Sequence, residues 1–259
     1  MKWSAPVLAG CALLAVACGG NDAPADPEPD PVDPPFSGTI FIDPDIITPE
    51  DPTTFTGLTH TGRGMRRMFD RRVSDWIDVE AILFEASFSD GPTVEVQVNP
   101  EFGTAEAGGV EAEFYADVIG RLPRSLRTDV RTVWIHQGVE PFGGGNDNLL
   151  IHVGQGARYV SDGILEETLV HEAVHTSIDG SHRVAPGWVA AQQADPTFIS
   201  TYARDFPQRE DLAESFLPYL AVRYRAERIS ASLRSTILAT MPSRIAYFDG
   251  LGLDILPID

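Results

Sequence analysis

The segment His171-Glu172-Ala173-Val174-His175 constrains this chain more than any other feature of its sequence. If the segment is helical, the two histidines lie one turn apart on the same face, where both imidazoles can reach a single ion. Glu172 is rotated by about 100° from His171, which suits contact with a water molecule on that ion better than ligation. The sequence therefore predicts His171 and His175 as metal ligands and Glu172 as a general base.

Flanking residues support a helix over 163–179. Ser161-Asp162-Gly163 offers an N-cap, Glu166 and Glu167 fall in the first turn, where the helix dipole favours acids, and Gly180 follows as a stop. Two histidines make only half of a zinc site, so a third ligand is needed.

A second helix, predicted over 207–220, presents candidate carboxylates. Pro207 suits a first helical turn, and Glu210 and Glu214 lie one turn apart beside an apolar face. Glu210 and His182 are both candidates for the third ligand. The alternatives Asp179, Asp211 and Glu214 also stay open.

The residues from 148 to 220 resemble the zincin metallopeptidases, and specifically the glutamate-zincin branch. There the HExxH helix is completed by a glutamate on a later helix, and the string Glu210-Asp211-Leu212-Ala213-Glu214 looks like the ExxAE pattern of the anthrax lethal factor catalytic domain and of predicted bacterial lipoprotein zinc peptidases. The metzincin pattern is excluded, because it requires glycine at 178 and histidine at 181, where this chain has Ile178 and Ser181.

The resemblance implies a zinc-dependent peptide hydrolase, with endopeptidase activity expected, in which Glu172 activates a metal-bound water. It implies Glu210 as the third Zn²⁺ ligand and Glu214 as the carboxylate that holds a ligand histidine. It also implies a tyrosine that stabilises the oxyanion. Tyr202 is the nearest match, although its spacing to Glu210 is one residue longer than in that family.

The expected fold class is α+β, with a mixed sheet, the metal-binding helix packed against it and a mainly helical C-terminal lobe. Residues 76–88 and 93–98 are β-prone runs joined by a turn signal, which predicts a hairpin. Residues 104–122 have apolar side chains at helical spacing, and 130–136 and 148–153 read as strands. The second of these strands is expected to precede the metal helix directly and to border the cleft, where it could pair with an extended substrate.

Three further features favour structural interpretations. His136 and His152 fall in predicted strands and are expected to be structural. The glycine-rich loop 138–145 lacks the Lys-Ser/Thr of a nucleotide-binding loop. Residues 36–61 read as short strands and turns, and the five arginines within 63–72 are expected to pair with carboxylates rather than to grip phosphate.

The N-terminus reads as an export and anchoring region. Residues 1–17 combine Lys2 with a short apolar run, and small residues lead into Cys18, which resembles the lipidation site of a bacterial lipoprotein. Ala15 departs from the leucine preferred there, and ordinary signal cleavage and an uncleaved anchor remain alternatives.

Residues 18–36 are rich in Asp, Glu and Pro, which predicts a disordered tether. Residues 37–259 are expected to form one domain, with a β-rich part 37–103 and a catalytic part 104–259.

Charge and cysteine content narrow the function classes. The formal net charge is −19, which argues against binding nucleic acid or anionic lipid through a basic surface. The lipid anchor is then the expected membrane contact, and the resemblance of Cys18 to a lipoprotein lipidation site implies a location in the bacterial cell envelope. Both cysteines lie in the first eighteen residues, so a cysteine nucleophile is excluded from the body. The alternative function is a surface lipoprotein that binds a partner or glycan, with a structural or vestigial zinc site closed by four protein ligands.

Overall fold

The computed structural model describes residues 32–40 and 45–258, which belong to one compact unit. The signal at 1–17, Cys18 and the greater part of the tether lie outside the described residues.

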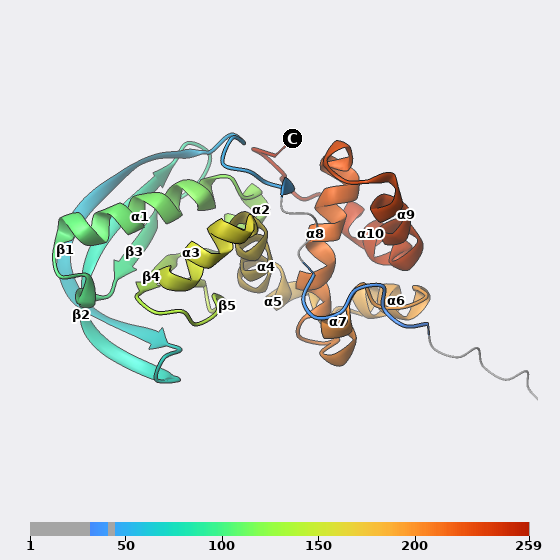
Figure 1. The fold of residues 1–259 in the computed structure, drawn as a ribbon, viewed down its shortest axis with the longest axis horizontal. Coiled ribbons are helices and arrows are strands. Elements are labelled where there is room, and N and C mark those ends of the chain that lie inside the picture. The colour runs from blue at the N-terminus through green and yellow to red at the C-terminus, as the bar shows by residue number, and fades with distance from the viewer. Residues whose placement is uncertain (1–31, 41–44, 259) are drawn as a thin grey trace, which may run out of the picture. The chain divides into compact units, whose positions relative to one another are not determined.

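The fold is α+β, as predicted, with a mixed six-stranded sheet (Figure 1). In chain order the elements are β1 (Phe55–Asp70), β2 (Asp75–Phe88), β3 (Val94–Val98), η2 (Pro100–Phe102), α1 (Ala105–Gly120), α2 (Arg124–Arg127), β4 (Thr132–His136), β5 (Gly143–Gly145), β6 (Asn148–His152), α3 (Val153–Asp162), α4 (Leu165–Ser177), α5 (Asp179–His182), α6 (Pro186–Ala194), α7 (Thr201–Asp205), α8 (Asp211–Tyr224), η3 (Ala226–Arg228), α9 (Ala231–Thr240) and α10 (Pro242–Asp249).

The strand order across the sheet is β1-β2-β3-β4-β6-β5. β2 and β3 form the predicted antiparallel hairpin, β3, β4 and β6 run parallel, and β5 pairs antiparallel with β6. The expectation that β6 borders the cleft is therefore wrong. β6 is flanked on both sides by strands, and the short glycine strand β5 forms the sheet edge on this side.

Alternating side chains along β2 give the sheet two buried faces. Ile82 and Phe84 belong to the main core, where α1 packs on the sheet. Gly108 of α1 permits this close approach, because a Cβ atom there would meet the side chain of Val98. On the opposite face Ala81 and Leu83 join Met68 in a smaller cluster, against which Trp134 and neighbouring apolar side chains pack.

β1 differs most from its sequence-based expectation, because it is a single strand of 16 residues where short strands and a basic cluster were predicted. It is an edge strand with few buried side chains, so its sequence lacks the apolar alternation that marks a strand. Its arginines are paired in part, as expected. Arg66 contacts Glu95 at 2.8 Å, and Arg72, just beyond the strand, contacts Asp70 and Glu101 at 2.7 Å each.

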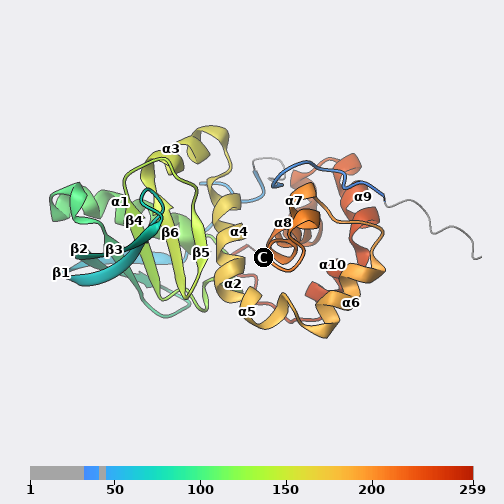
Figure 2. The same ribbon diagram turned by 90° about the horizontal axis from the view of Figure 1, so that it is seen from below.

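Helix α4, which carries His171 and His175, lies between the sheet and the helices that follow (Figures 1 and 2). α8 packs against α4 on one side and against α9 and α10 on the other. Two helix starts were predicted wrongly. Ser161 and Asp162 do not cap α4, because they end α3, which closes at Gly163 with φ +68°. α8 begins at Asp211 and not at Pro207, and Glu210 is its N-cap residue.

The tether predicted over 18–36 is wrong at its last residue, where Phe36 contacts the body, and Gly38 of the predicted domain does so as well. Phe36 forms a parallel β-bridge with Ser200, and the backbone N–H of Gly38 donates to Thr201 Oγ1 at 2.8 Å. Among the described residues, no helix has both the length and the apolar character needed to cross a bilayer.

Candidate metal centre

Three side-chain atoms converge where α4 meets the start of α8. His171 Nε2 and His175 Nε2 are 3.1 Å apart, and Glu210 Oε2 lies 3.4 Å from the first and 3.2 Å from the second. The helical spacing of the histidines and the 35-residue return of the chain through α5, α6 and α7 produce this convergence. Among the described residues this is the one group of three or more potential ligands close enough to share an ion.

The triangle has the dimensions of a zinc site. Zinc bonds to histidine nitrogen and carboxylate oxygen at about 2.0–2.2 Å, so the ligand atoms of a tetrahedral site lie about 3.3 Å apart. The three observed separations fall on either side of that value. Two imidazoles and one carboxylate are a donor set that zinc favours, and three protein ligands leave one tetrahedral position for another molecule. The residues therefore fit a zinc ion with an open position.

Each histidine has a carboxylate behind it. His175 Nδ1 lies 2.6 Å from Asp179 Oδ2, and His171 Nδ1 lies 3.5 Å from Glu214 Oε1. With its proton on Nδ1, His175 donates a hydrogen bond to Asp179 and His171 turns its N–H toward Glu214, and each Nε2 lone pair is then directed at the shared position. Glu214 thus lies behind His171, and its role as the orienting carboxylate stays a prediction. Asp179, which the sequence analysis weighed as a third ligand, is instead the corresponding partner of His175.

Glu214 is itself held firmly. Its side chain is fully buried, and its Oε2 accepts hydrogen bonds from Ser200 Oγ at 2.6 Å and from the backbone N–H of Ile40 at 3.1 Å. Burial raises the pKa of Glu214, and His171 opposes this shift. Two segments far apart in sequence therefore fix the carboxylate that orients His171.

The electrostatics of the cluster favour a cation. Burial alone would raise the pKa of Glu210, but hydrogen bonds with His171 and His175 hold it well below its ordinary value. Burial lowers the pKa of His175, yet Asp179 and Glu210 more than offset this and raise it well above the usual range. The negative potential that stabilises a proton on His175 also stabilises a bound metal ion.

Glu172 lies on α4 beside the edge strand β5. Its backbone carbonyl is in close contact with Gly144, where no Cβ atom could be accommodated. The side chain is half-buried, and its charge adds to the effect of burial in raising the pKa of Tyr159. The glycine-rich sequence of β5 thus allows the strand to approach α4 closely, which is a structural role and not a phosphate cradle.

Tyr202 lies beside Glu210 and Arg209. Burial raises the pKa of its hydroxyl, and the neighbouring Glu210 carboxylate raises it further, so the phenol keeps its proton at neutral pH. Arg209 stacks on Phe206 at 4.4 Å and its Nε donates to Glu210 Oε1 at 2.7 Å. Glu210 therefore has one oxygen directed at the histidines and the other bound to an arginine.

The remaining candidates lie elsewhere. His182 Nδ1 is 2.7 Å from Tyr247 Oη, and Asp211 Oδ2 is 2.9 Å from Arg244 Nε, so neither joins the ligand group. His136 and His152 are fully buried and stacked at 5.3 Å between neighbouring strands, which is the structural environment expected for them. A site closed by a fourth protein ligand is not formed among the described residues.

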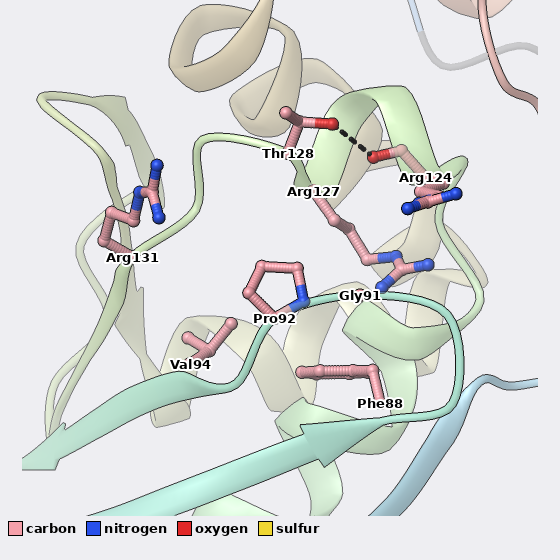
Figure 3. Close-up of a pocket in the computed structure, with 8 residues that line it drawn as sticks. All are labelled: Phe88, Gly91, Pro92, Val94, Arg124, Arg127, Thr128 and Arg131. Atoms are coloured by element: carbon pink, nitrogen blue, oxygen red, sulfur yellow. Dashed lines mark hydrogen bonds between the residues drawn. The ribbon is translucent and has the colours of Figure 1, made fainter.

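A pocket of about 400 Å³ opens beside the ligands. Its lining includes His175, Glu210 and Asp179 of the cluster, the end of β5 at Gly144 and Gly145, and Arg183 and Arg209. A second pocket, of about 170 Å³, is lined by Arg124, Arg127 and Arg131 and contains none of the ligand residues (Figure 3). The first pocket is therefore the one that a molecule bound at the metal position would enter.

Sequence reasoning did not assign Asp179, Ser200, Arg209 or Gly144 to the roles they have here. One signal was present for Asp179, since it follows His175 by one helical turn, which is the spacing that lets side chains meet. The others depend on loop paths that no local pattern reveals.

No protein-family model, curated protein sequence or solved structure matches this chain.

Proposed function

We propose that this chain is a zinc-dependent peptide hydrolase. The observation that carries the proposal is the convergence of His171 Nε2, His175 Nε2 and Glu210 Oε2 within 3.4 Å, with Glu172 directly after the first histidine. The HExxH and ExxAE strings that resemble the glutamate zincins supply these residues. The open position in the ligand set favours catalysis over a purely structural metal.

The chain's own residues divide the work of hydrolysis. His171, His175 and Glu210 would hold the ion, which when bound lowers the pKa of water and polarises a carbonyl. Glu172 accepts a proton from the attacking water while the oxygen of that water bonds to the scissile carbonyl carbon. The same proton then passes to the leaving nitrogen as the C–N bond breaks, which makes Glu172 base and then acid.

Tyr202 is proposed to stabilise the oxyanion. Its protonated phenol lies next to Glu210, and a hydroxyl donor beside the reacting carbonyl stabilises the charge that develops on oxygen. Arg209 holds the outer oxygen of Glu210, so it acts by positioning this ligand.

The edge strand β5 suggests a peptide as the substrate. One side of β5 pairs with β6, and no described strand pairs with its other side. An extended peptide can add to such an edge through main-chain hydrogen bonds, which would hold it alongside α4 and Glu172. The substrate-binding strand proposed here is β5, in place of the strand expected from sequence.

The decisive experiment is Glu172→Gln in the purified protein. We expect zinc content, measured by elemental analysis, to stay at one ion per chain, and peptide hydrolysis to fall at least 100-fold because the general base is lost. Glu227→Gln on η3, whose side chain is 70% exposed, is the matched control and should behave as the unmodified protein. Full activity in Glu172→Gln would refute the assignment.

We also propose an envelope location, with Cys18 carrying a lipid anchor. The support is the sequence alone, because this region lies outside the described residues. Metabolic labelling with a fatty acid tests it, since Cys18→Ser should abolish incorporation.

A further inference from the structure

We propose that the peptides cleaved by this protein carry acidic side chains close to the scissile bond, and that Arg183 and Arg71 recognise them. The inference rests on the proposed hydrolase function and specifies its substrate class. It follows from two arginines that lie at the two ends of β5 and have no carboxylate partner among the described residues.

Arg183 lies in the pocket beside the metal ligands. It follows α5, its side chain is exposed, and it lines the 400 Å³ pocket together with His175 and Glu210. Most arginines of this acidic chain pair with an aspartate or glutamate, whereas within the part of the chain described here Arg183 forms no ion pair. An unpaired guanidinium in a pocket next to the reacting centre is available to a ligand carboxylate.

Each acid in the same pocket already contacts a histidine or an arginine. Asp179 Oδ2 is bound to His175, and the two oxygens of Glu210 face the histidines and Arg209. The charged lining therefore balances as two acids, Asp179 and Glu210, against two arginines, Arg183 and Arg209. A divalent cation held by the ligands leaves the pocket net positive, which favours an anionic group there.

Arg71 lies at the other end of the edge strand. It follows β1 in the turn to β2, and its guanidinium packs over Gly143, where a Cβ atom would lie 2.8 Å from its Nη2. It also contributes to the electrostatic environment of Tyr159, the residue whose pKa Glu172 raises. Its neighbour Arg72 pairs with Asp70 and Glu101, but Arg71 has no such partner among the residues described.

A peptide lying along β5 would pass between these cations. Arg71 lies beside Gly143, and Arg183 shares its pocket with Gly145 and Asn146. The net charge of −19 does not oppose this locally, because at physiological ionic strength exposed charges are screened beyond about 8 Å. Side chains of a bound peptide would meet the nearby arginines and not the distant acids.

The arginine pocket of Figure 3 is a weaker candidate for anion recognition. Arg127 is paired with Asp90 at 2.5 Å and Arg124 with Asp254 at 3.3 Å, so two of its three cations are neutralised within the chain. Arg183 and Arg71 differ, because neither has an acidic partner among the described residues and both lie beside β5.

The first test uses a degenerate peptide library digested by the zinc-loaded protein, with product ends sequenced by mass spectrometry. We expect Asp and Glu to be enriched about tenfold at positions flanking the cleaved bond, as befits one charge-assisted hydrogen bond. Arg183→Gln should remove the enrichment on one side of the bond and Arg71→Gln on the other. Arg234→Gln on α9 makes the same charge change on an exposed surface and should leave both preferences intact.

The second test measures binding without turnover. Zinc-loaded Glu172→Gln protein is titrated with fluorescent peptides that differ only by Glu or Gln at the enriched position. We expect the Glu peptide to bind about tenfold more tightly, and the difference to disappear when Arg183→Gln is added. Zinc content of each variant is measured to show that the metal site is intact.

The two proposals fail in different ways. Cleavage of Glu and Gln peptides at equal rates, with equal affinities, would overturn acidic recognition while leaving the hydrolase intact. Absence of any cleavage by the zinc-loaded protein would overturn the hydrolase, and the binding comparison would still report whether the arginines select acidic peptides.

Discussion

Asp179 Oδ2 lies 2.6 Å from His175 Nδ1, one helical turn beyond the imidazole it contacts. The pair crosses the junction between α4 and α5, so His175 links the end of α4 to the next helix. A carboxylate in this position fixes the tautomer of the imidazole and increases its basicity.

Asp179→Asn is expected to weaken zinc binding by about 10- to 100-fold, because the amide cannot supply the charge that favours the Nδ1 proton. Competition with a fluorescent chelator measures the change. Asp162→Asn, at the exposed end of α3, is the control and should bind zinc as the unmodified protein does. Equal zinc affinities for the two variants would show that Asp179 does not contribute to zinc binding.

Gly144→Ala is expected to destabilise the fold and misplace β5. The new methyl group would overlap the Glu172 carbonyl, and overpacking of this kind costs about 1–3 kcal/mol. Urea denaturation measures the loss. Gly57→Ala in β1 has no atom within 4 Å of the new methyl and should change stability little. An undiminished free energy of unfolding in Gly144→Ala would show that β5 and α4 are less closely packed than described.

Arg244→Met is expected to lower the free energy of unfolding by about 3–5 kcal/mol. Arg244 contacts Asp195 and Asp211 at 2.9 Å each, all three side chains are fully buried, and the substitution leaves two carboxylates without a cation. Because Asp211 directly follows Glu210, zinc affinity should fall as well. Arg223→Met breaks an exposed pair with Asp249 and should cost less than about 1 kcal/mol. Similar losses in both variants would contradict the prediction.

Glu167 is expected to make stability fall as pH rises. Burial raises its pKa from 4.5 to about 7, against the opposing effect of its hydrogen bond with the Ile47 N–H. Between these values the folded chain binds the proton that the unfolded chain has released. The stabilisation is complete below about pH 4.5 and is lost, to the extent of about 3 kcal/mol, as pH passes 7.

Urea denaturation of metal-free protein at pH 5 and pH 8 tests this dependence without the contribution of zinc. Glu167→Gln should reduce the difference in unfolding free energy between the two pH values. Glu227→Gln, with an exposed side chain, should retain it. A dependence that survives in Glu167→Gln would have to arise from another group.

Sequence reasoning predicted the elements whose patterns are local. The helix carrying His171 and His175, the helix of Ala105–Gly120 and the β2–β3 hairpin each have apolar spacing or turn residues that identify them. Glu210 was reached through the resemblance, because nothing local shows that a carboxylate 35 residues away returns to the histidines.

The elements that were missed lack such patterns. β1 is stabilised by backbone pairing with β2 and has mostly polar exposed side chains, so its sequence does not alternate. α3 contains Gly154 and Gly156, which favour loops, but Gly156 is needed there because it lies in close contact with the hydroxyl of Tyr115. Tertiary packing overrides local propensity at these positions.

The hydrogen bond from the Ile40 backbone to Glu214 ties the early part of the chain to the imidazole of His171. Proteolytic trimming past this residue would leave the Glu214 carboxylate dependent on Ser200 alone for its hydrogen bonds. A cut on the C-terminal side of Ile40 would therefore loosen the orientation of His171 without any change in His171, His175 or Glu210 themselves.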